Sequence, residues 1–198
     1  MESYTCFEKI NLQNLTRLLR VETDPQKKTK LLKFQKLATP QGIIKCEYKN
    51  KKHVAGRLYA YPSLQGVDKQ TRQIISAPSW DFDIVNAYPT ILMNLCNAHG
   101  IKCDILADYV ANRDAWLKTG ITKDNIIHSL FGSQEYTTSQ RLLDFRCEIA
   151  RITDRLISVP EYKELARAVK GLKSNAREQS VISYIIQTTQ ALLIPQTR

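Results

Sequence analysis

The sequence predicts an α+β protein, with a small antiparallel sheet among many helices and a mostly helical C-terminal half. Three observations predict this class. Apolar residues recur at helical spacing in both terminal regions, two short stretches rich in aromatic and β-branched residues flank a basic turn near Asn50, and the pattern from Asp104 onward is helical almost throughout. The chain has 198 residues, 43% of them hydrophobic, so it is long enough to bury a core.

The N-terminal elements are expected to be two helices followed by two strands. Apolar spacing predicts the first helix over residues 7–20. Asp24 followed by Pro25 is typical of a helix start, and we expect this second helix to end near Leu37. The next expected elements are two strands and a helical turn, over residues 43–48, 54–61 and 72–75.

The central block is expected to be a strand followed by a helix. Partial alternation predicts the strand over residues 80–85, and Pro89 suits the first turn of a helix that ends near Ala98. The C-terminal half should hold long helices over residues 138–157 and 175–193. The expected division of the chain is a basic helical and hairpin segment, a core that contains the central block, and a helical region, at residues 1–52, 53–132 and 133–198.

Positive charge is concentrated near the N-terminus. Residues 1–60 carry 13 Lys and Arg against 5 Asp and Glu, a net charge of +8 out of +10 for the whole chain. A surface of this kind binds phosphates because each contact releases condensed counterions. The candidate nucleic-acid contacts in the stretch KKTKLLKFQK are Lys27, Lys28, Lys30 and Lys33. A solvated helix face and a charged hairpin tip are the alternative.

Three tyrosines are interleaved with the basic residues of the predicted hairpin. Tyr48, Tyr59 and Tyr61 could stack on the bases of a single strand, although tyrosine is also a common strand residue. Few apolar anchors accompany the lysines, so a membrane surface is not the expected partner. The expected partner is therefore DNA or RNA.

Several other classes of protein are disfavoured. No apolar run approaches the roughly 20 residues of a membrane span, and the N-terminus lacks the pattern of a signal peptide, so we expect a cytoplasmic or nuclear location. The five cysteines form no CxxC pair and are interpreted as free thiols. The sequence contains no GxxxxGK[ST] loop and no GxSxG motif, which argues against a P-loop ATPase and a serine hydrolase.

Two carboxylates stand out in SWDFDIVNAYPTIL. Asp81 and Asp83 are two residues apart, so on a strand both side chains leave the same face. Such a pair repels unless a cation lies between the carboxylates, and hard oxygen ligands suit Mg²⁺. The alternative is that Asp83 or Asn86 caps the helix that Pro89 helps to start.

The same stretch resembles a polymerase motif. DIVNAYPTI, from Asp83, resembles motif A of family B DNA polymerases. The resemblance implies that Asp83 binds the metal, that Tyr88 packs under the nucleotide sugar, and that Asn86 occupies the position of the usual serine. A family A alignment implies Asp81 instead, so both acids are kept and Asp83 is taken as the principal ligand.

A second resemblance lies upstream. GRLYAYPSLQGV is similar to a family A polymerase segment that contacts the primer-template, which implies nucleic-acid contacts for Arg57, Gln65 and Arg72. The whole block is most similar to polymerase-like proteins of large DNA viruses and mobile elements with the pattern GRxY...SLQ...DIDxxNAHP. This resemblance implies a virus-encoded protein of DNA replication.

Two further basic residues are candidates for contacting a nucleotide. KDNIIHSLFG resembles the polymerase helix that presents a lysine to the triphosphate, which implies that role for Lys123, with one residue more before Phe131 than in the families. An ordinary amphipathic helix capped by Gly132 is the alternative. Arg113 is a second candidate for phosphate contact.

One part of the polymerase site has no counterpart in the sequence. Polymerases hold two metal ions with a second aspartate from a later hairpin, and no DTD, HD or DG element follows Gly132. Two hypotheses follow. The chain is part of a template-directed, magnesium-dependent nucleotidyltransferase, with a later segment or second polypeptide supplying the missing carboxylate. Otherwise, it is an inactive nucleic-acid-binding or assembly protein built on the same palm-like fold that the polymerase resemblance implies.

Overall fold

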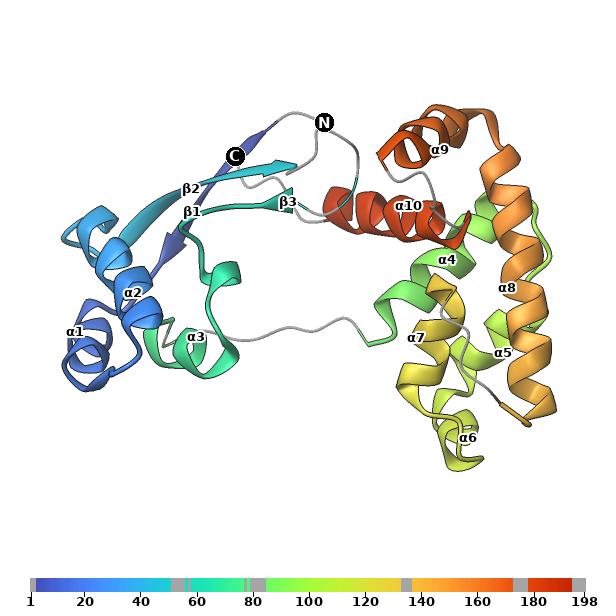
Figure 1. Cartoon of the computed structure of the whole chain (residues 1–198), viewed down its shortest axis with the longest axis horizontal. Coiled ribbons are helices and arrows are strands. Elements are labelled where there is room, and N and C mark those ends of the chain that lie inside the picture. The colour runs from blue at the N-terminus through green and yellow to red at the C-terminus, as the bar shows by residue number, and fades with distance from the viewer. Residues whose placement is uncertain are drawn as a thin grey trace. The chain divides into compact units, whose positions relative to one another are not determined.

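The computed structural model describes residues 3–50, 56, 58–76, 78, 85–132, 137–172 and 178–193. It confirms the predicted α+β class, since helices predominate and a three-stranded antiparallel sheet lies near the start of the chain (Figure 1). The chain folds into two compact units, which are described separately below. The three-segment division predicted from composition stays a prediction.

The N-terminal unit is built on a three-stranded sheet. Its strands are β1 (Tyr4–Lys9), β2 (Ile43–Asn50) and β3 (Leu58–Tyr59), antiparallel in the order β1-β2-β3. Two helices, α1 (Leu12–Val21) and α2 (Pro25–Leu37), connect β1 to β2 (Figure 1). The sheet therefore uses one face to cover a core shared with these helices. The buried members of that core are Ile10, Leu15, Leu19, Leu31, Phe34, Ile44, Cys46, Ala60 and Ile75.

The chain opens with a strand, so the first predicted helix is wrong over residues 7–11 and confirmed over residues 12–20. Residues 4–9 form β1, which pairs with β2 from Tyr4↔Tyr48 to Lys9↔Ile43. The helix begins only after Asn11, whose side chain accepts a hydrogen bond from the Asn14 N–H at 2.9 Å. Pairing with the distant strand β2 determines the structure of residues 4–9. The apolar spacing of residues 7–20 gives no sign of this pairing.

The second helix begins where the sequence predicts. The Asp24 carboxylate accepts hydrogen bonds from the backbone N–H groups of Gln26 and Lys27, and Pro25 occupies the first turn. Leu31 and Phe34 anchor the helix in the core and are each 1% exposed. The local capping chemistry is therefore sufficient to define this helix.

A tight turn joins α2 to β2 and requires glycine at position 42. Gly42 has φ +76° and its carbonyl accepts a hydrogen bond from the Ile10 N–H at 2.8 Å. A β-carbon at this position would collide with the backbone carbonyl oxygen of Ile10. Glycine meets both the left-handed backbone and the close approach.

The segment after β3 forms two short helices. The 3₁₀ helix η1 (Leu64–Gly66) follows Ser63, and α3 (Lys69–Ile75) begins after Asp68, whose side chain accepts from the Thr71 N–H at 2.9 Å. The predicted helical turn at residues 72–75 is thus part of a longer helix. The strand predicted over residues 54–61 is observed at Leu58–Tyr59, and residues 54, 55 and 57 lie outside the described residues.

The C-terminal unit is helical throughout the ranges that the structure describes. Helix α10 packs against α4, α7, α8 and α9 (Figure 1). The helices are α4 (Ala87–Ala98), α5 (Asp104–Ala111), α6 (Arg113–Lys118), α7 (Lys123–Phe131), α8 (Gln140–Ser158), α9 (Pro160–Leu172) and α10 (Glu178–Leu193). Between α5, α6 and α8 the core contains an aromatic cluster, in which the Trp116 ring lies edge-on to Tyr109 at 5.5 Å and to Phe145 at 5.7 Å.

Most helices of this unit agree with the sequence prediction. Helix α4 has Pro89 in its first turn and ends at Ala98, and the long α8 is displaced by only one or two residues from the predicted range. Gly132 caps α7 in the left-handed conformation, with φ +78°. The strand predicted over residues 80–85 falls mostly outside the described residues, and Val85 lies in a turn.

Two general features bear on function. The five cysteines are free thiols, as predicted, and Cys46, Cys96 and Cys103 are buried. Among the helices that the structure describes, none combines the length and apolar character needed to cross a membrane.

Candidate nucleic-acid interface

The carboxylates predicted to bind a metal are not part of the described structure. Asp81, Asp83 and Arg57 lie outside the described residues. Elsewhere in the described ranges, no group of three or more His, Cys, Asp and Glu side chains could hold a metal ion. A metal site at Asp81 and Asp83 therefore remains a prediction from sequence.

Asn86 and Arg113, two of the predicted nucleotide-binding residues, both lie near Tyr109. Asn86 precedes α4 with φ +56°, and its side chain makes no capping hydrogen bond. Its amide oxygen instead accepts a hydrogen bond from the Tyr109 hydroxyl at 3.3 Å. Burial raises the pKa of Tyr109, and the charge and hydrogen bonding of the nearby Arg113 guanidinium partly offset that rise. Tyr109 thus contacts Asn86 and lies close enough to Arg113 to be affected by its charge, a position that no local sequence pattern marks.

Arg113 has unused hydrogen-bonding capacity. Its Nε is buried without a hydrogen-bond partner among the described residues, and its ion pair with Asp114 is long, at 3.5 Å. The side chain is 29% exposed. The buried Nε is out of reach of a ligand, but the terminal nitrogens of this partly exposed guanidinium can donate to an incoming anion, which is compatible with the predicted phosphate contact.

Tyr88 and Lys123 lie at opposite ends of α7. The half-buried Tyr88 ring packs edge-on against Phe131, the last residue of that helix, with ring centroids 5.3 Å apart. Lys123 is exposed in the first turn, about 12 Å away along the helix axis by its rise per residue. Thr122 and Asn125 form a capping box that fixes this end.

The candidate lysines of α2 are all exposed, but two of them have partners. The Lys27 ammonium lies 3.6 Å from the Asp68 carboxylate. Lys33 lies over the ring of Tyr61, 4.2 Å from the ring centroid. Lys28 and Lys30 are exposed on other sides of the helix. Lys28, Lys30 and Lys33 thus leave α2 on sides other than the one that Leu31 and Phe34 bury. Lys27, four residues before Leu31, lies at the N-terminal end of the buried side.

The uncovered face of the sheet carries aromatic rings beside lysines. Phe7 on β1 is directly opposite Lys45 on β2, and Tyr59 on β3 is directly opposite Lys49. Phe7 is 69% exposed and Tyr59 is 39% exposed. Side chains directly opposite one another in an antiparallel pair lie about 4.5–5.5 Å apart at Cβ. The sequence prediction missed Phe7 because it placed this residue in a helix. In the structure, residues 5–9 alternate between exposed and half-buried, as expected for a strand.

Tyr48 does not belong to this exposed set. It points to the inner side of β2, where its hydroxyl donates to the Glu8 carboxylate at 2.7 Å. The same carboxylate accepts from the Ser63 hydroxyl at 2.7 Å and from the Leu64 N–H at 2.6 Å. Burial is the main cause of a raised pKa for Tyr48. Tyr48 is thus a structural strand residue, which was the alternative that the sequence left open.

The remaining two predicted contacts are Gln65 and Arg72. Gln65 lies in the turn formed by Ser63, Leu64 and Gln65, called the SLQ turn below. The exposed Gln65 donates from its amide nitrogen to the Leu58 carbonyl at 3.1 Å, which holds the turn against β3. Arg72 is partly exposed in the last turn of α3. Both residues belong to the N-terminal unit, and their contact with nucleic acid stays a prediction from sequence.

Comparison with known proteins gives one viral relative. The chain is 33% identical over 127 residues to a protein of Sputnik virophage named "Putative helicase V13". The match covers 56% of this chain but only 16% of that protein. No protein-family model matches the chain, and no solved structure matches it significantly. The likeness is therefore to a viral protein, and it does not single out polymerases.

Proposed function

We propose that this chain is a nucleic-acid-binding part of a virus-encoded replication protein, and that its N-terminal unit binds a single strand. One observation supports this proposal above the others. Three exposed aromatic rings each lie beside a lysine: Phe7 beside Lys45, Tyr59 beside Lys49, and Tyr61 under Lys33. A ring can stack on a base while the neighbouring ammonium neutralises a phosphate of the same strand.

A single strand is the ligand that fits these pairs best. Bases can lie flat on an aromatic ring only when they are unstacked, and each such contact contributes about 1–3 kcal/mol. The side chains of this sheet face are exposed in the part of the chain that the structure describes, and Lys9, Lys45 and Lys49 outnumber its acidic residue Glu47, which pairs with Lys49 at 2.9 Å. The stacking is tolerant of sequence, so we expect little preference among bases.

The name of the virophage relative contains the word helicase, but it does not require this chain to be an ATP-driven helicase. This sequence contains no GxxxxGK[ST] loop, so the matched region includes no P-loop for ATP. Because the match covers 16% of that protein, we propose that the shared part handles nucleic acid.

We further propose template-directed nucleotidyl transfer as the reaction of the complete site. The support is the motif resemblance, together with the hydrogen bond between Asn86 and Tyr109 and the nearness of Tyr109 to the charge of Arg113. Asp83, helped by Asp81, would hold Mg²⁺, which when bound would stabilise charge on the phosphates. Arg113 and Lys123 would then bind the triphosphate. A later segment or a second polypeptide would supply the second carboxylate.

An inactive nucleic-acid-binding or assembly protein is the second candidate. It is favoured by the edge-on packing of Tyr88 against Phe131, because a ring used in the core is less available to a nucleotide sugar. This candidate shares the single-strand surface and differs only in lacking chemistry.

Binding can be tested by fluorescence anisotropy with labelled single-stranded DNA and RNA at several salt concentrations. We expect affinity to fall steeply with salt, and replacement of Phe7 and Tyr59 by Ala to weaken binding about tenfold or more. Changing Lys27, Lys28, Lys30 and Lys33 to Glu should weaken binding to every sequence alike. Val21→Ala is a matched control, since Val21 is 72% exposed in the same unit. Failure to bind at low salt would refute the proposal.

Chemistry can be tested by primer extension with nucleoside triphosphates and Mg²⁺ or Mn²⁺. We expect this chain alone to bind but not to extend the primer, because one pair of acids holds only part of the two-metal arrangement. Extension by the wild type but not by Asp83→Asn would show that a second acid of this chain reaches the metal. Extension restored by an added partner, in the wild type alone, would identify a split polymerase.

A further inference from the structure

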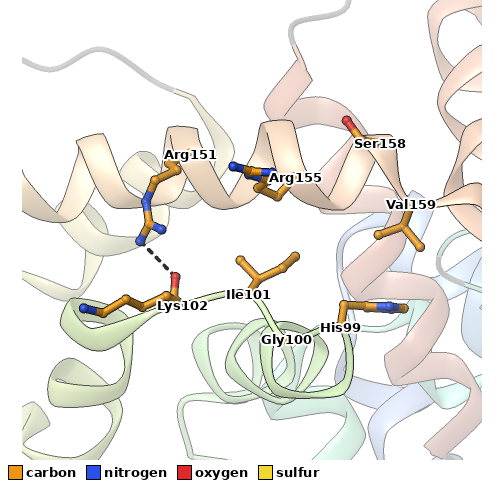
Figure 2. Close-up of a pocket in the computed structure, with 8 residues that line it drawn as sticks. All are labelled: His99, Gly100, Ile101, Lys102, Arg151, Arg155, Ser158 and Val159. Atoms are coloured by element: carbon orange, nitrogen blue, oxygen red, sulfur yellow. Dashed lines mark hydrogen bonds between the residues drawn. The ribbon is translucent and has the colours of Figure 1, made fainter.

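The C-terminal unit contains a cavity of about 500 Å³ with basic walls. It lies between the segment that follows α4 and the C-terminal half of α8 (Figure 2). None of the lining side chains is a carboxylate. The lining residues are His99, Gly100, Ile101, Lys102, Arg151, Arg155, Ser158 and Val159.

Arg151 is held in a fixed position at this cavity. One of its terminal nitrogens donates to the Lys102 carbonyl at 2.9 Å and lies 3.3 Å from the Glu148 carboxylate (Figure 2). Glu148 is itself buried and accepts a hydrogen bond from the Leu106 N–H at 2.7 Å. Both contacts of Arg151 use the same nitrogen, so the rest of its guanidinium fork can still donate.

Arg155 lies one helical turn later and is not neutralised. It makes no hydrogen bond or ion pair with any other described residue of this protein. Two like charges four residues apart on a helix are mutually destabilising by a few tenths of a kcal/mol, on the order of 0.2–0.5. The carbonyl end of α8 offsets Arg155 only in part, because it carries about half of one negative charge.

The other two basic residues of the cavity, Lys102 and His99, each lie beside an acidic side chain. The Lys102 ammonium pairs with Asp104 at 2.9 Å, but the two side chains are 73% and 67% exposed, so this pair is weak. His99 lies 3.2 Å from the Glu161 carboxylate and 3.3 Å from the Tyr162 hydroxyl. Among the described residues, the nearby acids thus pair with Lys102, Arg151 and His99, and none pairs with Arg155.

We propose that this cavity binds a phosphate group through Arg155, Arg151 and Lys102. Guanidinium groups bind phosphate oxygens through paired, charge-assisted hydrogen bonds. Ile101 and Val159 give the same cavity an apolar wall against which an attached sugar or base can lie, and its volume is in the range of small-molecule sites. The phosphate belongs to a free nucleotide or to the backbone of a bound strand. This site is independent of the sheet surface and of any polymerase reaction.

The test is isothermal titration calorimetry of the full chain with pyrophosphate. We expect Arg155→Gln to raise the dissociation constant about tenfold, since a charge-assisted contact is lost. Arg167→Gln should leave it unchanged, because Arg167 is an exposed arginine of α9 outside the cavity. Arg155→Lys should give an intermediate affinity, since it keeps the charge and loses the planar fork. Thermal unfolding of each variant checks that it is folded.

The results also distinguish the two sources of phosphate. If Arg155→Gln weakens the binding of both pyrophosphate and single-stranded DNA, the ligand is a backbone phosphate; if only pyrophosphate binding falls, it is a free nucleotide. Replacing Phe7 and Tyr59 should leave pyrophosphate binding intact, so failure of the sheet proposal is visible separately. Absence of pyrophosphate binding by the wild type, or equal losses in Arg155→Gln and Arg167→Gln, would overturn the proposal.

Discussion

The two units use their helices differently. In the C-terminal unit, α8 buries seven of its residues, including Phe145 and Leu156. In the N-terminal unit, α2 buries only Leu31 and Phe34 and exposes all of its lysines. Packing therefore explains most of the α8 sequence but little of the α2 sequence. The comparison indicates that the N-terminal unit is the one whose surface composition requires a functional explanation.

The units also differ in what holds their parts together. The C-terminal unit relies on an aromatic cluster around Trp116, whereas a single carboxylate, Glu8, joins β1, β2 and the SLQ turn of the N-terminal unit. Substitutions in the dispersed apolar contacts and in the single polar network should therefore change the free energy of unfolding by different amounts. Four predictions test this difference.

The largest effect is expected in the aromatic cluster. Trp116 is fully buried, and its indole N–H donates to Asp108 at 2.8 Å. Trp116→Ala should lower the free energy of unfolding by about 3–5 kcal/mol, measured by urea denaturation followed by circular dichroism. Lys118→Ala, on the same helix, should change it by less than about 0.5 kcal/mol. A small effect of the Trp116 change would show that the cluster is not what holds the unit together.

The next effect is expected in the carboxylate network. Glu8→Ala removes the acceptor for three hydrogen bonds and leaves their donors partly buried, so we expect a loss of about 2–3 kcal/mol. Glu47→Ala, on the exposed face of the same sheet, removes only a surface ion pair and should cost less than about 1 kcal/mol. Equal losses in the same denaturation assay would contradict the role of Glu8.

A smaller effect concerns the contact between Lys33 and Tyr61. An exposed cation–π pair contributes about 0.5–1 kcal/mol. A double-mutant cycle of Lys33→Ala and Tyr61→Ala should therefore give a coupling free energy of that size in unfolding experiments. A coupling of zero would mean that the lysine does not stay over the ring in solution.

The smallest expected effect is a dependence of the free energy of unfolding on pH, through Asp108. Hydrogen bonds from Asn112, Trp116 and Arg141 hold the pKa of Asp108 below its ordinary value of 3.8. Its contribution to stability is thus full above that value and disappears as pH falls through the lowered pKa. The side chain is 42% exposed, so screening keeps the effect to roughly 1 kcal/mol or less. Asp108→Asn should reduce the difference in stability between pH 6 and pH 3, whereas Asp114→Asn should not.

Local chemistry decided which helices could be predicted from the sequence. Asp24 with Pro25, and Pro89 in the first turn of α4, act on the residues next to them, so the sequence identifies these starts correctly. The strand at residues 4–9 depends on pairing with β2, almost forty residues away, and no local pattern contains that information. For this reason, the first predicted helix was wrong over residues 7–11 and right over residues 12–20.

The same distinction applies to the candidate site. The exposure of the α2 lysines followed from their spacing and charge, whereas the position of Phe7 beside Lys45 follows from strand register. Tyr109 meets Asn86 only because α5 packs against α4. Residues that are brought together by tertiary packing are therefore the part of the site that sequence alone could not supply.

The turn at Gly42 sets a limit on how this sequence can change. A β-carbon there would enter the space of the Ile10 carbonyl oxygen, whereas at Gly100 and Gly120 it would meet nothing within 4 Å. All three glycines have positive φ, so asparagine is a possible replacement at Gly100 and Gly120. In a library randomised at these three positions, folded members should vary at 100 and 120 and keep glycine at 42. The hydrogen-only side chain of Gly42 thus allows the turn by which the chain passes from α2 back to the sheet at β2.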